Sequence, residues 1–218
     1  MPRRLGQLTP FMPARDRNKN LLLFAAGVLW VIGLAFGLRA SLNYENAPAA
    51  PGQAPAHWPA ESKIQRDFGV PTLVVMAHPH CPCTRATLGE MAVLMARAQK
   101  RVNAVVVFVV PNGVPEKWEE TDVWRNAAQI PGVRVVKDPG GKESALFGAL
   151  ASGQTMFYDA GGKLQFSGGI TASRGHSGDN AGRSTITALL LGGKSEIKTT
   201  PVFGCYLGNP ETRARNGS

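Results

Sequence analysis

The sequence lacks the features that mark several common classes of protein. Only three of its 218 residues are cysteine, an odd number, so at least one thiol stays free, binds a metal or pairs outside the chain. No stretch interleaves basic and aromatic residues, which argues against a nucleic-acid partner in spite of the net charge of +9. No internal repeat is visible. The length therefore predicts one ordinary domain with appendages.

Charge is missing altogether from residues 21–38, "LLLFAAGVLWVIGLAFGL". A helix of about 18–20 apolar residues crosses the hydrocarbon core of a membrane. The leader, residues 1–20, carries five basic residues and one acidic residue, whereas only Arg39 follows the apolar stretch before Lys63. The positive-inside rule then places the leader in the cytoplasm and everything after residue 39 on the other side of the membrane.

Two interpretations of this apolar stretch remain open. A cleaved signal peptide has an apolar region of about 7–15 residues that ends in small residues. The stretch here is longer, and the "RASLNYENA" that follows it is a poor cleavage site. We therefore favour an uncleaved signal anchor. In a Gram-negative host this predicts a single-pass inner-membrane protein with its soluble domain in the periplasm, where disulfides persist.

The rest of the chain divides into three parts by composition. Residues 39–64 contain "APAAPGQAPAHWP", whose alternating Ala and Pro predict a semi-extended linker and no helix. Residues 65–195 form the predicted domain. Residues 196–218 form a tail that contains Cys205.

Apolar periodicity in the domain predicts alternating strands and helices. The predicted strands cover residues 72–77, 104–110 and 133–138, followed by a hairpin from 155–159 and 163–168. The predicted helices begin near Pro82 and cover residues 115–129, 142–150 and 181–191, the last with Asp179 or Asn180 as its cap. This order predicts an α/β fold, a central mixed sheet flanked by helices.

Residues 81–91, "CPCTRATLGEM", follow the first strand and resemble the Cys-Pro-Pro-Cys-Arg-Ala-Glu-Met-Pro-Glu-Leu motif of membrane-tethered thioredoxin-like and peroxiredoxin-like proteins. Together with "SGQTMFYD", "FSGGIT" and "TPVFGC", the sequence is also similar to a RedB-like group. The resemblance covers roughly residues 65–195. It implies a thioredoxin-like fold with Cys81 as the nucleophilic cysteine, and a protein thiol or disulfide as the client.

Two departures from the thioredoxin pattern affect the expected chemistry. Thr84 falls where the resolving cysteine usually stands, and Cys83 places a thiol where proline is usual. Gln154 falls on the position of the cis-proline that precedes the strand facing the cysteines. Because a non-proline cis bond costs about 2.5–4 kcal/mol, we expect a trans bond there.

The position of Cys81 predicts a reactive thiol. It lies at the end of a strand, and we expect it to be the N-cap of a helix that has Pro82 at its first position, so that helix amides stabilise a thiolate. Thr84 can direct its hydroxyl at the same sulfur, and His80 or His78, if protonated, would lower the pKa of the thiol. A buried, inert cysteine is the alternative.

Two thiols are candidates for resolving a Cys81 disulfide. A ring between Cys81 and Cys83 would be tight, strained and easily reduced. Cys205 lies beyond the last predicted helix, and its tail could fold back over the edge of the sheet. In this redox hypothesis no cofactor is expected.

A metal carrier is the second hypothesis, and it uses many of the same atoms. Thiolates of Cys81, Cys83 and Cys205, with His78 or with His176 from the glycine-rich stretch 168–183, would suit Cu(I). Copper-delivery proteins of thioredoxin fold, the SCO-like group, separate their two cysteines by three residues, which this chain does not do. A third hypothesis is an interaction module of the same fold without chemistry.

Overall fold

The computed structural model describes residues 14–50, 52–98 and 101–208. The chain divides into two compact units, the first ending at Tyr44 and the second beginning at Glu45. The predicted leader, residues 1–20, lies mostly outside the described residues.

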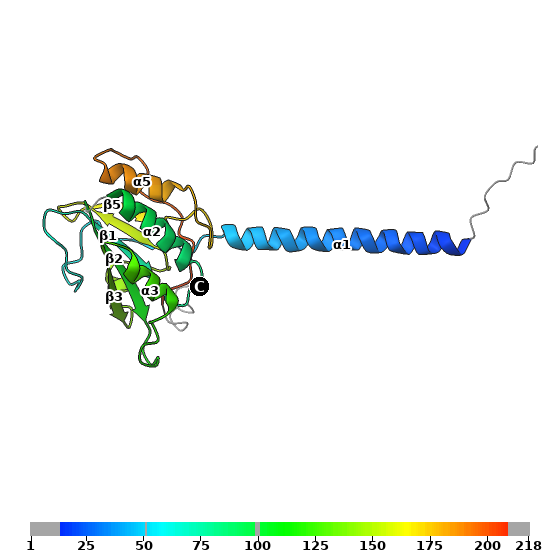
Figure 1. The fold of residues 1–218 in the computed structure, drawn as a ribbon, viewed down its shortest axis with the longest axis horizontal. Coiled ribbons are helices and arrows are strands. Elements are labelled where there is room, and N and C mark those ends of the chain that lie inside the picture. The colour runs from blue at the N-terminus through cyan, green and yellow to red at the C-terminus, as the bar shows by residue number, and fades with distance from the viewer. Residues whose placement is uncertain (1–13, 51, 99–100, 209–218) are drawn as a thin grey trace, which may run out of the picture. The chain divides into compact units, whose positions relative to one another are not determined.

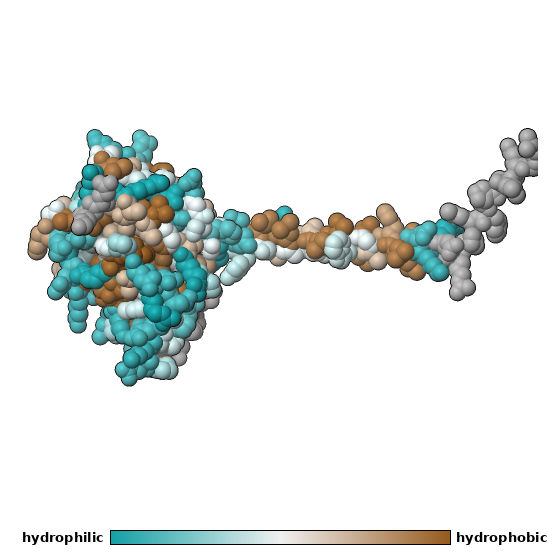
Figure 2. Space-filling view, viewed as in Figure 1, coloured by the Kyte–Doolittle hydropathy of each residue, from teal (hydrophilic) through white to brown (hydrophobic). Residues whose placement is uncertain are grey.

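The first unit contains all but the last two residues of a long apolar helix, α1 (Ala14–Asn46). Within it, Arg17–Asn46 is long and apolar enough to cross a membrane, with a mean hydropathy of 2.5 in its most apolar window. None of that window is buried by the protein, and Figure 2 shows large apolar side chains along the helix. A helix that is apolar on all sides and has no protein around it is typical of a membrane span.

The second unit contains a five-stranded mixed sheet (Figure 1). Its strands are β1 (Thr72–Ala77), β2 (Asn103–Val110), β3 (Val133–Pro139), β4 (Thr155–Tyr158) and β5 (Leu164–Gly168). Their spatial order is β3-β2-β1-β4-β5. Strands β1, β2 and β3 are parallel, whereas β4 pairs antiparallel with both β1 and β5.

Helices cover both faces of the sheet because the central strands are buried on both sides. The helices of this unit are α2 (Thr84–Ala98), α3 (Asp122–Gln129), α4 (Lys142–Leu146) and α5 (Ala181–Leu190). In β1, Leu73 and Val75 pack with α2, α3 and α5, while Val74 and Met76 pack on the opposite face with residues around α4. The predicted fold class is confirmed.

The helix predicted before the third strand begins later than expected. The helix predicted over 115–129 begins at Asp122, where Thr121 is the N-cap and its hydroxyl accepts a hydrogen bond from the amide of Trp124. Residues 115–120 form turns instead, and the buried carboxylate of Glu119 in this segment pairs with Lys137 on β3. Of the two caps predicted for α5, Asp179 and Asn180, the structure has Asn180, whose side chain accepts from the amide of Arg183.

The predicted linker, 39–64, has a different structure from the one expected. Helix α1 continues to Asn46, and the proline-rich residues after it lie along the domain. The amide of Ala49 donates to the carbonyl of Val202, and the ring of Trp58 packs edge-on against Phe147 and Tyr158. Proline prevents a helix here, but extended chain can still pack on a sheet.

Candidate functional site

Cys81 lies in a tight turn that joins β1 to α2. Its amide donates to the carbonyl of His78 at 3.1 Å, and its own carbonyl accepts from the amide of Thr84 at 3.1 Å. These short-range bonds close two consecutive 3₁₀-like turns before the helix, so Cys81 is not the helix N-cap that the sequence predicted. The first residue of α2 is Thr84. The side chain of Cys81 is almost completely buried, with 1% of the residue exposed.

The C-terminal tail brings Cys205 to Cys81. The backbone amide of Cys205 donates to the sulfur of Cys81 over 3.3 Å, across 124 positions of sequence. The tail is held there by its neighbours, because the amide of Ser152 donates to the carbonyl of Cys205 at 2.8 Å. The predicted partnership of these two cysteines is thus geometrically possible, although all three cysteines are free thiols in the structure.

Thr84 belongs to a buried hydrogen-bond network below the sulfur. Its hydroxyl lies 2.8 Å from the hydroxyl of Ser152 and 3.2 Å from the carbonyl of His78. The Ser152 hydroxyl also accepts from the amide of His78 at 2.9 Å. The Thr84 side chain also makes the smallest of the contributions that lower the pKa of Cys81. Thr84 and Ser152 therefore anchor the turn beside Cys81, and the predicted activation of Cys81 by Thr84 stays a prediction.

Hydrogen bonds lower the pKa of the Cys81 thiol to about 5. The largest contribution comes from the Cys205 side chain. The amides of Cys205 and Cys83 add to it, while burial opposes the shift. Donors aimed at a sulfur stabilise its thiolate more than its thiol. At neutral pH the structure therefore favours a thiolate at Cys81.

Cys83 and Cys205 are shifted in the opposite direction. Burial raises the pKa of the Cys83 thiol, and the neighbouring negative charge of Cys81 raises it further. The pKa of Cys205 is raised mainly because its thiol donates a hydrogen bond to the sulfur of Cys81. One thiolate with two protonated thiols beside it is the state expected when like charges compete for a small site.

Arg174 is a site residue that sequence reasoning missed. Its guanidinium donates to the carbonyl of Gly204 at 2.9 Å, and its charge acts on both Cys83 and Cys205. It lies in the glycine-rich loop between β5 and α5, where nothing local distinguishes it from a solvated arginine. The loop does approach the cysteines, as the sequence predicted for His176, but Arg174 makes the contact.

The histidines occupy less direct positions. His80 is exposed, with its ring tilted at 46° against that of Trp118, a centroid distance of 4.4 Å, and its Nε2 3.0 Å from the Trp118 carbonyl oxygen. The charge of Cys81 acts on the imidazole of His78 and raises its pKa, but burial has the larger effect and lowers it. A neutral imidazole brings no positive charge to the thiolate, so the structure gives His78 no part in lowering the pKa of Cys81. The predicted role of His80 as an activator stays a prediction.

The predicted metal ligands are only partly brought together. Cys81 contacts both Cys83 and Cys205, whereas the exposed His176 has its Nδ1 2.8 Å from the carbonyl oxygen of Arg174. Within the described ranges, no group of three or more His, Cys, Asp or Glu side chains is placed so that it could hold a metal ion.

Gln154 occupies the position in which thioredoxins have a cis-proline. As predicted, its peptide bond is trans, since the described residues contain no cis peptide bond. Its carbonyl accepts from the amide of Met76 at 2.9 Å, and the amide of Gly153 donates to the carbonyl of Met76 at 2.7 Å. These bonds fix the neighbouring backbone of residues 150–152, against which the tail lies.

Comparison of the sequence finds neither a matching family model nor a matching curated protein. Solved structures do match. A hypothetical protein from Sinorhizobium meliloti aligns at 21% identity over 65% of this chain and 81% of its own, with a TM-score of 0.54. An uncharacterized conserved protein from Geobacillus kaustophilus aligns at 19% identity over 76% and 93%, with a TM-score of 0.53.

A third solved structure matches more weakly. The exposed lipoprotein thioredoxin of Streptococcus pneumoniae aligns at 18% identity over 57% of this chain and 85% of its own, with a TM-score of 0.42. In this chain two parallel connections through α2 and α3 precede the antiparallel β4–β5 hairpin and α5, which is the order of elements expected from the resemblance. The second unit of the chain therefore has a thioredoxin-like fold.

Proposed function

We propose that the chain is a membrane-anchored thiol–disulfide redox protein whose soluble domain works outside the cytoplasm and whose nucleophile is Cys81. One observation carries the proposal: the buried sulfur of Cys81, in the turn before α2, accepts hydrogen bonds from Cys205, which make the largest contribution to lowering its pKa to about 5. A thiolate at neutral pH is the species that attacks disulfides.

In the proposed reaction the Cys81 thiolate attacks one sulfur of a client disulfide. A mixed disulfide forms, and the other client sulfur leaves as a thiolate. Cys205, or else Cys83, then gives up its proton and attacks the sulfur of Cys81. The client is released with both of its sulfurs reduced, and the protein retains an internal disulfide. Two electrons pass to the client, and a reductant of the thiol class must return them.

Alkylation of the reduced full-length protein in detergent tests the assignment of roles. We expect Cys81 to react with iodoacetamide at mildly acidic pH, and Cys83 and Cys205 to react only at alkaline pH, as read from peptide masses. Faster labelling of Cys83 or Cys205 at pH 6 would reverse the roles. A control with oxidised protein identifies which thiol pairs with Cys81.

The proposed topology has its own test. The apolar helix α1, with the basic residues before it, supports a single span with the N-terminus in the cytoplasm and the domain in the periplasm. A reporter enzyme fused after residue 60 should be active only if it functions outside the cytoplasm. Release of a soluble, shortened protein from cells would replace the anchor with a cleaved signal peptide.

Cu(I) binding is a second candidate because Cys81 contacts both other thiols. Soft thiolates favour Cu(I). In this case no disulfide should accumulate in the copper-loaded protein, and Cys205→Ser should weaken copper retention. In the redox case Cys205→Ser should abolish the resolved disulfide instead. Mass spectrometry after oxidation and after Cu(I) loading distinguishes the two. A protein that does neither would be an interaction module.

A further inference from the structure

The segment 204–207 forms a short strand against residues 150–152. The amide of Ser152 donates to the carbonyl of Cys205 at 2.8 Å, and the amide of Leu207 donates to the carbonyl of Leu150 at 3.0 Å. Tyr206 and Ala151 pair as an antiparallel bridge between these two bonds. An alternation of this kind is the ladder of an antiparallel pair. The tail thus presents its cysteine to Cys81 from an extended backbone.

This strand covers the proposed nucleophile. Cys81 is 1% exposed, and the amide of Cys205 points at its sulfur. A client disulfide has to place a sulfur in line with Cys81, which the tail prevents while it stays in position. Cys205 and Tyr206 are half-buried, whereas Gly204 and Leu207 are buried, so a segment that displaces the strand has to replace the packing of Leu207.

We propose that the strand 204–207 is an internal stand-in for the client, and that an extended, cysteine-containing polypeptide segment takes its place along residues 150–152. This inference rests on the proposed function. It adds the kind of client segment, because the residues of the tail show what the site accepts at each position.

The position before the cysteine requires glycine. A Cβ at Gly204 would collide with the carbonyl oxygen of Ser152, a backbone atom that cannot move away alone. The guanidinium of Arg174 holds the same residue from the other side through its carbonyl. A client segment with a side chain at this position would be lifted away from Ser152, and its cysteine would move away from Cys81.

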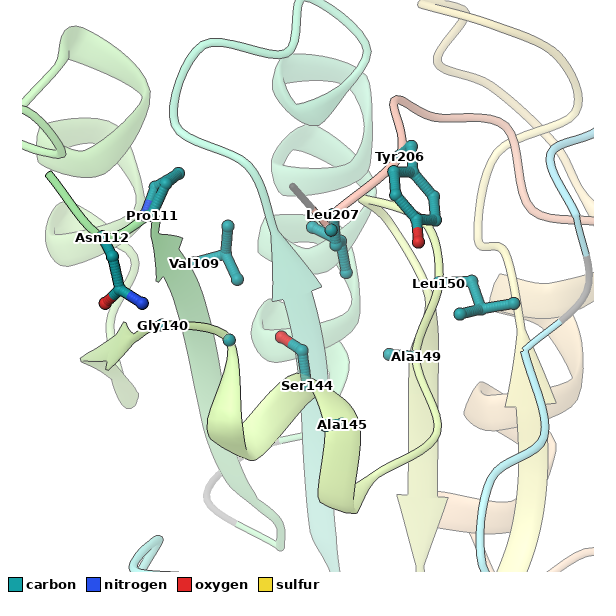
Figure 3. A pocket seen from close by; sticks show the side chains of 12 residues that line it. Val109, Pro111, Asn112, Gly140, Ser144, Ala145, Ala149, Leu150, Tyr206 and Leu207 are labelled. Carbon is teal, nitrogen blue, oxygen red and sulfur yellow. The ribbon is translucent and has the colours of Figure 1, made fainter. Parts of the chain in front are cut away.

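The second position after the cysteine accepts an apolar side chain. Leu207 is buried with the side chains of the α4 face of the sheet, among them Val109 and Phe147. Beside it is a pocket of about 400 Å³, and Figure 3 shows Leu207 and Tyr206 from the tail around the same hollow as Val109 and Ser144. Among the described residues nothing fills this pocket, so a client residue as large as phenylalanine has room there.

Displacement and resolution then become one event. The Cys81 thiolate attacks the client's cysteine sulfur, forms a mixed disulfide and releases the client's other sulfur. When the tail returns to residues 150–152, the Cys205 thiolate attacks the sulfur of Cys81 and the client's cysteine leaves as a thiolate. The Cys205 proton passes to solvent or to the departing sulfur, and the electrons balance as in the simple exchange.

Short peptides test the site directly. The peptide Phe-Gly-Cys-Tyr-Leu, activated as a mixed disulfide with thiopyridine, is added to the reduced full-length protein in detergent, and release of thiopyridone is followed. We expect it to react about tenfold faster than Phe-Gly-Cys-Tyr-Ala, which lacks the buried leucine. A similar deficit is expected for Phe-Ala-Cys-Tyr-Leu, because of the Ser152 carbonyl. Replacing leucine with phenylalanine should give an equal or faster rate.

A variant of the tail tests the covering role. Gly204→Ala should expel the strand, so that the native-like peptide reacts at least about threefold faster at pH 9, where a cysteine with an ordinary pKa is mostly thiolate. Gly89→Ala, on the exposed face of α2 where the added Cβ meets only ordinary contact, is the matched control and should leave the rate unchanged. Circular dichroism verifies that both variants are folded.

The outcomes separate this inference from the proposed function. If thiopyridine disulfide itself does not react with Cys81, the proposed function fails. If that small disulfide reacts but the peptides all react equally, the client site is wrong and the redox function stands. Slower peptide reaction in Gly204→Ala at pH 9 would also contradict the inference, because it would make the tail a part of the client's site.

Discussion

The loop of residues 78–84 and the tail of residues 199–208 meet at Cys81, but they are held by different kinds of contact. The loop is fixed mostly by its own short-range bonds, such as those from Cys81 to His78 and from Thr84 to Cys81. The tail is fixed by distant segments: the hydroxyl of Thr200 donates to the carbonyl of Gly169 at 2.7 Å, and Arg174 holds Gly204.

The two regions control different properties of Cys81: the loop controls the position of its sulfur, and the tail controls its ionisation. The turn before α2 fixes the position of the Cys81 sulfur, whereas Cys205 makes the largest contribution to lowering its pKa. Changes to the tail should therefore alter the reactivity of Cys81 without moving it. Changes within the loop should remove the nucleophile or its packing.

The largest effect is expected from the loop side. Cys81→Ser should lower the rate of disulfide reduction by about a thousandfold or more, because an alcohol is not ionised at neutral pH. Reduction of a small aromatic disulfide by the full-length protein measures this. Cys83→Ser is the matched control, and it should keep the first, thiopyridone-releasing step because Cys81 remains. Equal loss in both variants would show that the two thiols act as one unit.

A stability measurement tests how the loop that contains Arg174, the residue that holds the tail at Gly204, is attached to the domain. Glu90 on α2 and Arg183 on α5 form a buried ion pair, and Glu90 also accepts from the amide of Gly178 at 2.7 Å in the loop that contains Arg174. Glu90→Gln leaves a buried arginine without its main partner. We expect the free energy of unfolding to fall by about 3 kcal/mol, measured by denaturant titration with tryptophan fluorescence.

The exposed member of that cluster provides the control. Asp179 pairs with the same arginine but is fully solvated, so Asp179→Asn should cost less than about 1 kcal/mol. Equal losses for the two variants would show that the buried pair does not dominate the attachment of this loop.

Arg174→Ala tests whether the hydrogen bond from Arg174 to Gly204 holds the tail at Cys81. Without the bond to Gly204 the tail is less firmly held at Cys81, and we expect the pH midpoint of Cys81 alkylation to rise by about one unit, equivalent to a tenfold loss of thiolate at acidic pH. Arg97→Ala, on the exposed side of α2, is the control. An unchanged midpoint in Arg174→Ala would mean that the tail is held without this arginine.

The smallest effect is expected from the histidine nearest to the thiol. Burial lowers the pKa of His78, and the main contributions to the low pKa of Cys81 come from Cys205, Cys83 and Thr84. His78→Gln should therefore move the alkylation midpoint of Cys81 by less than about half a unit. A rise of a full unit or more would restore a protonated histidine as the activator that the sequence suggested.

Features that depend on residues close together in the sequence could be predicted, whereas features that depend on contacts between distant segments could not. Strand β1 and the cap at Asn180 were predicted because apolar runs and caps depend on neighbouring residues. The start of α3 was wrong because the pairing of Glu119 with Lys137 on β3 lies in the segment before it. The docking of Trp58 was missed for the same reason.

The candidate site divides in the same way. Cys81, Cys83 and Thr84 lie within one short motif, so their proximity could be predicted. Cys205 was a candidate because a lone tail cysteine is conspicuous, but its amide bond to the sulfur depends on the strand pairing with residues 150–152. Nothing in the sequence around Arg174 indicated that an arginine of the glycine-rich loop would hold that strand.

The central claim is that hydrogen bonds from the tail keep Cys81 ionised at neutral pH. The pH dependence of Cys81 alkylation in the reduced full-length protein tests it most directly. The folded pKa lies below that of a free thiol, so reactivity should persist through neutral pH and decline only as the pH falls through about 5. In Gly204→Ala, which displaces the tail, the midpoint should rise toward the ordinary value of about 8.5. A wild-type midpoint already near that value, or one that Gly204→Ala leaves unchanged, would contradict the claim.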